Sequence, residues 1–392
     1  MLVAGEAFTL VSDESVLGDT TRVATTYKNL HKVVKLGDQV LVDDGLISLT
    51  VVHIREDGSV DCRVDNSGAL GENKGVNLPG VVVDLPAVTD KDKRDIEFGV
   101  KMGIDIIAAS FIRKAEDVKE IRNLPGVREA GIHIMSKIES QEGLDNFNAI
   151  LEESDAIMVA RGDLGVEIPI YKVATAQKMM ISKCNTVGKP VITATQMLES
   201  MVTNPRPTRA EATDVANAVF DGSDCVMLSG ETAKGKYPVK TVHMMSKICN
   251  QAEGDIDYRA LYKKMRSSAV PPVPIPDTIA SSAVKTSWDL EAKLILCLTE
   301  TGNTARLVSK YRPACAILAV TSSAKVARQL TVCRAVVPFV VESMKGTDQI
   351  IKNALDYAKK LRLIVDGDRV VLTSGNIEGV SGSTNILRVL SA

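Results

Sequence analysis

Short apolar runs alternating with helical patterns dominate the middle of this 392-residue chain. Segments that read as strands are IDIIAASF (104–111), IHIMSKIE (132–139), AIMVARGD (156–163), PVITATQM (190–197) and CVMLSGE (225–231). The stretches DKDKRDIEFGVKMG and KAEDVKEIRNL, before and after the first strand, read as helices. Strands that are apolar throughout and separated by helices indicate a parallel sheet covered on both faces. The pattern therefore restricts the central region to a β/α architecture.

The regions on either side differ from the central one in their patterns of apolar and turn residues. Residues 1–85 alternate short β-prone runs with turn signals, such as REDGS between VLVDDGLISLTVVHI and VDCRV, and predict a small all-β domain. The tract SSAVPPVPIPD (267–277) holds four prolines, which favour an extended connection. The strands and helices that follow it predict a separate α/β sheet domain. We place the three domains at residues 1–85, 86–257 and 258–392.

Composition excludes several classes of protein. A hydrophobic fraction of 45% with 24% charged residues is typical of a folded globular chain. The 47 basic and 49 acidic residues nearly cancel and form no basic run, which argues against a nucleic-acid partner. No apolar stretch approaches the ~20 residues that a membrane-spanning helix needs, so we expect no membrane partner and a cytoplasmic location. Seven cysteines without a C-x-x-C pair predict reduced, buried thiols.

Polar residues follow each central strand, where the active sites of parallel α/β folds lie. Glu139 and Asp163 come at the ends of successive strands, and two carboxylates suit Mg²⁺. Lys137 lies two residues before Glu139 and so on the same face of the strand. A cation beside a metal-binding carboxylate suits phosphoryl transfer, which depends on positioning and positive charge.

Each of these signals has a simpler interpretation when it is taken alone. A single lysine or glutamate at a strand end is most often solvated, and Asp163 could equally be a helix N-cap. The glycines of SGALGENKGVNLPG (67–80) could serve only as turn residues, and no Walker-type GKS or GKT is present there. The turn LTETGNTAR (298–306) could bind phosphate or could simply cap its helix, and Glu300 places a negative charge in it.

Taken together, several segments resemble the pyruvate kinase family. They are KGVNLPG, DLPAVTDKD, ASFIRKAEDV, SKIESQEG, MVARGDLGVEIP, the run from KPVITATQ to GKYP (189–238) and STNILRV. The resemblance covers nearly the whole chain.

The resemblance implies a role for particular residues. Lys137 resembles the family's catalytic lysine at the transferring phosphoryl group, and Glu139 and Asp163 resemble its Mg²⁺ ligands. Gly162, Asp163 and Thr195 resemble the binding site for the phosphoenolpyruvate carboxylate, and Lys137 would also bind the substrate. The resemblance makes Thr195 a second catalytic residue beside Lys137. Lys74 resembles a nucleotide-side residue of a mobile β lid. The residues that would correspond to a phosphorylated-sugar effector site are Thr299, Thr301, Gly302, Asn303 and Thr304.

The same resemblance implies a reaction and partners. Phosphoenolpyruvate would give its phosphoryl group to ADP, forming ATP and enolpyruvate, which is then protonated to pyruvate. Mg²⁺ or Mn²⁺ would be the divalent cofactor, and K⁺ is expected from the family. The PRPTRAE segment (205–211) resembles a stretch near a subunit contact, and full-length members are typically homotetramers.

The chain departs from the family pattern in its strand count. Five parallel strands are found in the central region, whereas a closed (β/α)₈ barrel has eight. We therefore expect an incomplete barrel of TIM type, with the all-β lid beginning almost at Met1. The family's residues for the monovalent cation, and an early-strand arginine that contacts phosphate, cannot be mapped onto this chain. Because missing strands would expose apolar faces, we expect a fragment, an incomplete gene model or a shortened isoform of reduced activity.

Two other functions remain open from the sequence. A non-catalytic regulatory or binding subunit would keep the last domain and the contact surface but would not turn over. A Mg²⁺-dependent aldolase-type lyase would also place a Glu and an Asp around the metal, although Lys137 and the lid argue against it.

Overall fold

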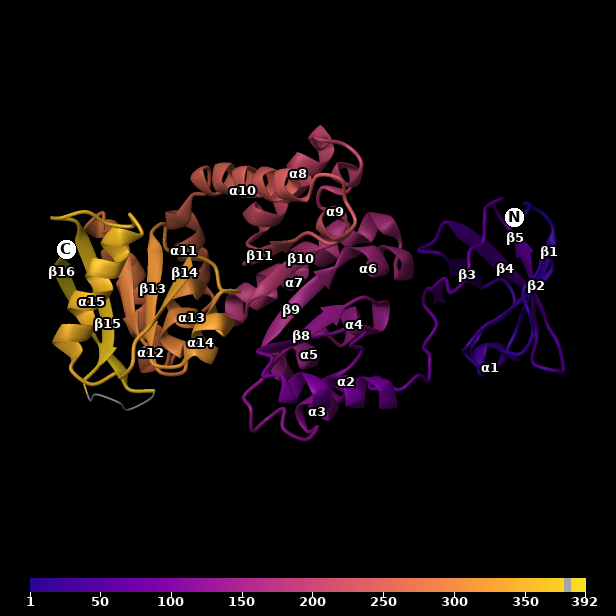
Figure 1. The fold of residues 1–392 in the computed structure, drawn as a ribbon, viewed down its shortest axis with the longest axis horizontal. Helices are drawn as coiled ribbons and strands as arrows, with labels where there is room; N and C mark the ends of the chain where they lie inside the picture. The colour runs from indigo at the N-terminus through magenta and orange to yellow at the C-terminus, as the bar shows by residue number, and fades with distance from the viewer. Residues whose placement is uncertain (377–381) are drawn as a thin grey trace.

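The computed structural model describes residues 1–376 and 382–392, and the chain forms three bodies in a row (Figure 1). The N-terminal module lies at one end, the central domain in the middle and the C-terminal domain at the other end. The predicted fold class is confirmed, whereas the boundaries at residues 85/86 and 257/258 stay predictions. No helix in the described part of the chain has the length and apolar character that crossing a bilayer requires.

The N-terminal module contains a six-stranded sheet in the order β2-β1-β5-β4-β3-β6. Its longest strand, β4, buries Ile47, Leu49 and Val51 and leaves the residues between them partly exposed, as in a sheet with one packed face. One helical turn, α1, is an addition to the predicted all-β module. The elements are β1 (Ala7–Val11), β2 (Arg22–Ala24), α1 (Leu30–Val33), β3 (Gln39–Val42), β4 (Ile47–Ile54), β5 (Val60–Val64) and β6 (Val76–Asn77).

The central domain is built on a parallel sheet in the order β11-β10-β9-β8-β7. The middle strands β9 and β10 are buried along their whole length, which explains their continuous apolar sequences. The five predicted strands are confirmed, and β7 and β11 form the edges of this sheet. The strands are β7 (Ile106–Ala109), β8 (His133–Ile138), β9 (Ala156–Ala160), β10 (Val191–Ala194) and β11 (Cys225–Met227).

Helices and short 3₁₀ turns connect these strands. The helix α2 begins at a capping box formed by Thr89 and Asp92, which fixes where the central domain starts to be helical. The helical elements are α2 (Asp90–Lys101), α3 (Ala115–Arg122), α4 (Gln141–Asp145), α5 (Phe147–Glu153), α6 (Arg161–Glu167), η1 (Ile170–Lys172), α7 (Val173–Val187), η2 (Glu199–Val202), α8 (Arg209–Asp221), α9 (Gly230–Ala233) and α10 (Pro238–Gly254).

The C-terminal domain has its own sheet, in the order β14-β13-β12-β15-β16. Neighbouring strands are parallel except for β15 and β16, which are antiparallel. The elements are α11 (Tyr258–Ser267), α12 (Ile275–Asp289), β12 (Leu294–Leu298), α13 (Asn303–Lys310), β13 (Ala316–Thr321), α14 (Ala324–Leu330), β14 (Val336–Val340), α15 (Thr347–Lys360), β15 (Arg369–Gly375) and β16 (Thr384–Ser391).

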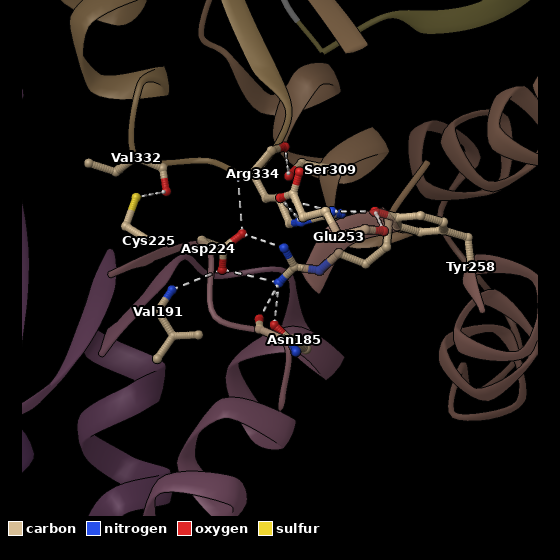
Figure 2. Close-up of polar contacts among 11 residues, drawn as sticks. Asn185, Val191, Asp224, Cys225, Glu253, Tyr258, Ser309, Val332 and Arg334 are labelled. Atoms are coloured by element: carbon tan, nitrogen blue, oxygen red, sulfur yellow. Dashed lines mark hydrogen bonds and ion pairs between the residues drawn. The ribbon is translucent and has the colours of Figure 1, made fainter. Parts of the chain in front are cut away.

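A buried ion pair joins the central and C-terminal domains. Asp224, which precedes β11, accepts hydrogen bonds from Arg312 Nη1 at 2.7 Å and from the Val191 amide at 3.0 Å. Arg312 also donates to Asn185 Oδ1 at 2.5 Å. Figure 2 shows Asp224 between Val191 of the central domain and Arg334 of the C-terminal domain. The backbone amide of Arg334 donates to Asp224 Oδ1 at 3.2 Å. The two domains are thus joined by charged groups that are out of contact with solvent.

The N-terminal module has a single covalent connection to the rest of the chain. Residues 78–89 run from β6 to α2 without a helix or strand (Figure 1). Most of residues 82–86 are exposed. A second contact is the hydrogen bond from Asn77 Nδ2 to Glu167 Oε1 of α6, at 2.8 Å. The module therefore touches the very helix that carries Asp163.

Candidate active site

Lys137 and Glu139 form an ion pair where β8 ends. The Lys137 Nζ atom lies 2.7 Å from Glu139 Oε1 and donates to Ser110 Oγ at 2.7 Å. The Phe111 amide donates to Glu139 Oε2 at 2.5 Å. The Glu139 side chain is fully buried, whereas Lys137 remains 22% exposed. The predicted proximity of the lysine and the carboxylate is confirmed, while their roles stay predictions.

Each oxygen of the Glu139 carboxylate has a partner, the Lys137 ammonium for Oε1 and the Phe111 amide for Oε2. Burial raises the pKa of the Glu139 carboxyl, and the bonds from Lys137 and Phe111 act in the opposite direction. The Lys137 ammonium, 2.7 Å from Oε1, balances the charge of this buried oxygen. A buried carboxylate is costly unless a positive charge lies beside it, and here that charge is the Lys137 ammonium.

Asp163 lies in the first turn of α6, directly after β9. The N-cap of this helix is Ala160, so the alternative interpretation of Asp163 as the N-cap is wrong. Burial raises the pKa of both Glu139 and Glu167. The negative charge of Asp163 raises the pKa of each of them further. Asp163 is therefore close enough to both carboxylates to act on them electrostatically.

The donor set is compatible with Mg²⁺ but not with a site made only of protein ligands. Within residues 1–376 and 382–392, no three His, Cys, Asp or Glu side chains gather as a metal-binding group. Protein Mg²⁺ sites commonly use one or two carboxylates, and water or substrate phosphate provides the other ligands. Glu139 and Asp163, at the ends of neighbouring strands, match this arrangement.

Gly162 and Thr195 pack against each other at the ends of β9 and β10. A Cβ atom added to Gly162 would lie 2.7 Å from Thr195 Cγ2, so only glycine fits. Thr195 and Gln196 have φ values of 75° and 53°, in the left-handed region that β-branched residues rarely adopt. The structure thus brings Thr195 beside Gly162 and the adjacent Asp163.

Arg161, directly after β9, holds the turn at Thr195 and Gln196 in place. Its guanidinium donates to the Thr195 carbonyl at 2.8 Å and forms an ion pair with Asp214 of α8 at 2.6 Å. The sequence placed Arg161 at a strand end but gave it no role, and it gave no reason to select Asp214, which lies 53 residues away. Strain at a site of this kind persists only where surrounding contacts fix it.

Glu231 is a second supporting residue that the sequence left without a role. It is fully buried after β11 and accepts hydrogen bonds from the amides of Leu198 at 3.0 Å and Ser229 at 2.8 Å. These bonds join the turn after β10 to the end of β11. The only sign of Glu231 in the sequence is its position after a predicted strand. Ser229 has the same position, so the sequence does not distinguish the two.

Replacing Gly162 by alanine tests this packing. The added methyl group would force Thr195 away from its position, because the closest atom, Cγ2, belongs to a short branched side chain. We expect a loss of roughly 10- to 100-fold in kcat/KM for the acidic substrate, as for a small misplacement of site residues. Steady-state kinetics measure it, with Gly254→Ala as the matched control, since no atom lies within 4 Å of that position. Equal effects of the two changes would contradict the role of the packing.

Lys74 belongs to a cavity between the N-terminal module and the central domain. The cavity has a volume of about 1910 Å³ and is lined by Lys74, Ser110, Phe111 and Glu167, among others. Lys74 Nζ lies 2.9 Å from Asp43 Oδ1 within the module, and this pairing raises the pKa of the lysine. The cavity thus reaches from Lys74 to the immediate partners of Lys137 and Glu139.

The turn from Thr299 to Thr304 connects β12 to α13, as the sequence predicted. Thr299 is buried, and Thr304 is buried with its hydroxyl 2.7 Å from that of Thr384. Gly302, with φ 79°, is the buried N-cap of α13. Of the five predicted residues, Thr301 and Asn303 are exposed. The Glu300 carboxylate accepts from Ser322 Oγ at 3.3 Å. An effector role for this turn stays a prediction.

Comparisons with known proteins agree along the whole chain. The family model for the pyruvate kinase barrel domain matches residues 1–242, and the model for the pyruvate kinase alpha/beta domain matches residues 277–390. Pyruvate kinase of Dictyostelium discoideum is 56% identical, with coverage of 100% of this chain and 78% of that protein. Pyruvate kinase of Eimeria tenella is 52% identical, with coverage of 99% and 73%.

Solved structures give the same result. A crystal structure of a pyruvate kinase from Cryptosporidium parvum superposes with a TM-score of 0.92 at 48% identity, and covers 100% of this chain and 79% of that one. Another structure of the Cryptosporidium parvum enzyme, in complex with ADP, gives a TM-score of 0.91 at 48% identity.

Proposed function

The chain belongs to the pyruvate kinase family of phosphotransferases. We propose a role for each of its site residues in the transfer of a phosphoryl group from phosphoenolpyruvate to ADP. The observation that carries the proposal is the contact of Lys137 with the buried Glu139 at the mouth of a parallel sheet, within the electrostatic reach of Asp163. Such a cluster provides positive charge and metal ligands at one point, which phosphoryl transfer requires.

Lys137 is the residue that contacts the migrating group. Its ammonium is fixed from two sides, by the Ser110 hydroxyl and by Glu139, and part of it faces solvent. A cation fixed in advance stabilises charge that develops on the equatorial oxygens without reorganising during the reaction. Lys137 therefore acts through position and charge.

Glu139 and Asp163 are the residues that would hold the divalent cation, Mg²⁺ or its substitute Mn²⁺. When bound, the cation neutralises charge on the phosphoryl oxygens and orients them. Glu139 is suited to this role because it is a fully buried carboxylate directly after β8, beside the Lys137 ammonium. K⁺ stays an expectation from the family alone, since no residues of this chain are assigned to it.

Gly162, Asp163 and Thr195 would bind the carboxylate of phosphoenolpyruvate. The close contact of Gly162 with Thr195 brings the backbone of α6 and the threonine side chain to one place. Short polar groups and backbone amides at such a point can orient a small acid for in-line transfer. Proton addition to the enolpyruvate completes the reaction.

The nucleotide is placed on the side of the N-terminal module. Lys74 lines the cavity that also contains Ser110 and Phe111, and the relative with ADP bound has the same fold. The module would then act as a lid that excludes water when both substrates are present. A phosphorylated-sugar effector at Thr301 and Asn303, and a homotetrameric assembly, are proposed only by likeness to the family.

A coupled assay of pyruvate formation tests the function. We expect turnover that requires ADP, phosphoenolpyruvate and Mg²⁺ together, and that stops when EDTA removes the metal. Release of pyruvate and an aldehyde from a hydroxy-oxo acid, without ADP or phosphoenolpyruvate, would instead support the lyase. Binding of phosphoenolpyruvate without turnover would support a non-catalytic subunit. Size-exclusion chromatography of the same sample reports the assembly.

A further inference from the structure

The loop between β7 and α3, residues 110–114, touches both halves of the catalytic ion pair. Ser110 Oγ accepts the hydrogen bond of Lys137 Nζ at 2.7 Å, and the Phe111 amide donates to Glu139 Oε2 at 2.5 Å. Phe111 has φ 51°, a left-handed conformation that is uncommon for a non-glycine residue. Any shift of this loop therefore changes the partners of the lysine and of the carboxylate together.

The same loop contacts the connection to the N-terminal module through Arg113. Its guanidinium donates from Nη1 to the Val83 carbonyl at 2.7 Å and from Nη2 to the Leu85 carbonyl. These two carbonyls are two residues apart, which matches the alternation of an extended chain and the fork of an arginine. Both acceptors are neutral, so the contact depends on geometry more than on charge pairing.

The residue between those carbonyls is bound to the module. The Asp84 carboxylate accepts from Asn29 Nδ2 at 2.7 Å and from the Tyr27 hydroxyl. Tyr27 and Asn29 precede α1 in the module, whereas Arg113 belongs to the central domain. Residues 83–85 are thus held by the module through a side chain and by the central domain through the backbone.

Arg113 itself is fixed at its backbone. Its amide donates to Asp117 Oδ2 at 2.9 Å, and its carbonyl accepts from Asn146 Nδ2 at 2.9 Å. The Asp117 side chain is buried, which limits how far this anchor can move. Because its backbone is anchored, Arg113 holds the linker carbonyls and the loop in one relative position, and its two bonds break when the linker leaves that position.

We propose that Arg113 is a positioning residue that couples the orientation of the N-terminal module to the Lys137–Glu139 pair. When the module moves residues 83–85 away, the two bonds of the Arg113 guanidinium break, and the loop that carries Ser110 and Phe111 loses one of its restraints. The catalytic consequence rests on the proposed function, but the mechanical coupling does not. The substrate that closes the module would in this way complete the site.

The test uses two variants. Arg113→Met removes both guanidinium hydrogen bonds to the linker, and Arg113→Lys keeps a positively charged donor that can form one of them. Hydrogen–deuterium exchange is measured on the full chain in peptides that cover residues 79–88 and Phe111. We expect Arg113→Met to accelerate exchange at least tenfold in both peptides, and Arg113→Lys to give a smaller increase in both. Arg128→Met is the control, because Arg128 is an exposed residue of the same domain.

Kinetics provide the second readout. With ADP varied, Arg113→Met should raise KM for the nucleotide about tenfold and lower kcat, while the melting temperature stays close to that of the parent. Faster exchange at residues 79–88 with unchanged exchange at Phe111 would overturn the coupling, as would unchanged exchange at both. If the parent chain shows no turnover, the proposed function fails, and the exchange data still decide the coupling.

Discussion

Replacing Lys137 by methionine is expected to lower kcat by about 10²- to 10³-fold, the usual effect of removing a group that stabilises transition-state charge. Methionine keeps the approximate length of the side chain and removes the ammonium that contacts Ser110 and Glu139. Because the lost interaction is one with the migrating group, kcat should fall more than KM rises. The measurement is the coupled assay at saturating phosphoenolpyruvate, ADP and Mg²⁺.

Two further variants make this result interpretable. Lys137→Arg keeps a positive charge in a different shape and should give an intermediate rate. Lys172→Met changes an exposed lysine of the same domain and should leave kcat within about twofold. A Lys137→Met enzyme that keeps more than a tenth of the parent kcat would contradict the assigned role.

Replacing Asp224 by alanine should lower the free energy of unfolding by about 3–5 kcal/mol, because it leaves the Arg312 guanidinium buried without its partner. The side chains of Asp224 and Arg312 are 6% and 3% exposed. At about 2–4 °C for each kcal/mol, the melting temperature should fall by roughly 10 °C. Differential scanning calorimetry measures this shift.

The matched control is a solvent-exposed ion pair on α12. Lys285 and Asp289 are more than half exposed, and Asp289→Ala should change stability by less than about 1 kcal/mol. The double variant Asp224→Leu/Arg312→Met removes both charges and should be more stable than Asp224→Ala. An equal loss in Asp224→Ala and Asp289→Ala would show that the buried pair does not join the domains.

The strands and their order along the chain could be predicted because each has a strong local signal. The β9 and β10 segments are continuously apolar since both faces are covered, and Lys137 and Glu139 are close in the sequence. Their convergence with Asp163 followed from the parallel arrangement, because parallel strands end on the same side of a sheet.

What the sequence could not provide depends on contacts between distant residues or on backbone strain. Arg312 and Asp224 are 88 residues apart, and Asn77 and Glu167 are 90 apart, with no spacing pattern to connect them. The left-handed conformations of Thr195 and Phe111 run against the preferences of these residue types. Contacts between residues distant in the sequence hold these conformations in place, and a single sequence does not reveal such contacts.

The module's attachment through residues 78–89 also bears on how the chain acquires its structure. Its buried core residues, from Leu2 to Leu78, all lie within the first 85 positions and pack against one another. During synthesis, a segment of this kind can fold as soon as it leaves the ribosome, well before β11 is made. The exposed residues of this connection would then be a preferred place for proteolytic cleavage.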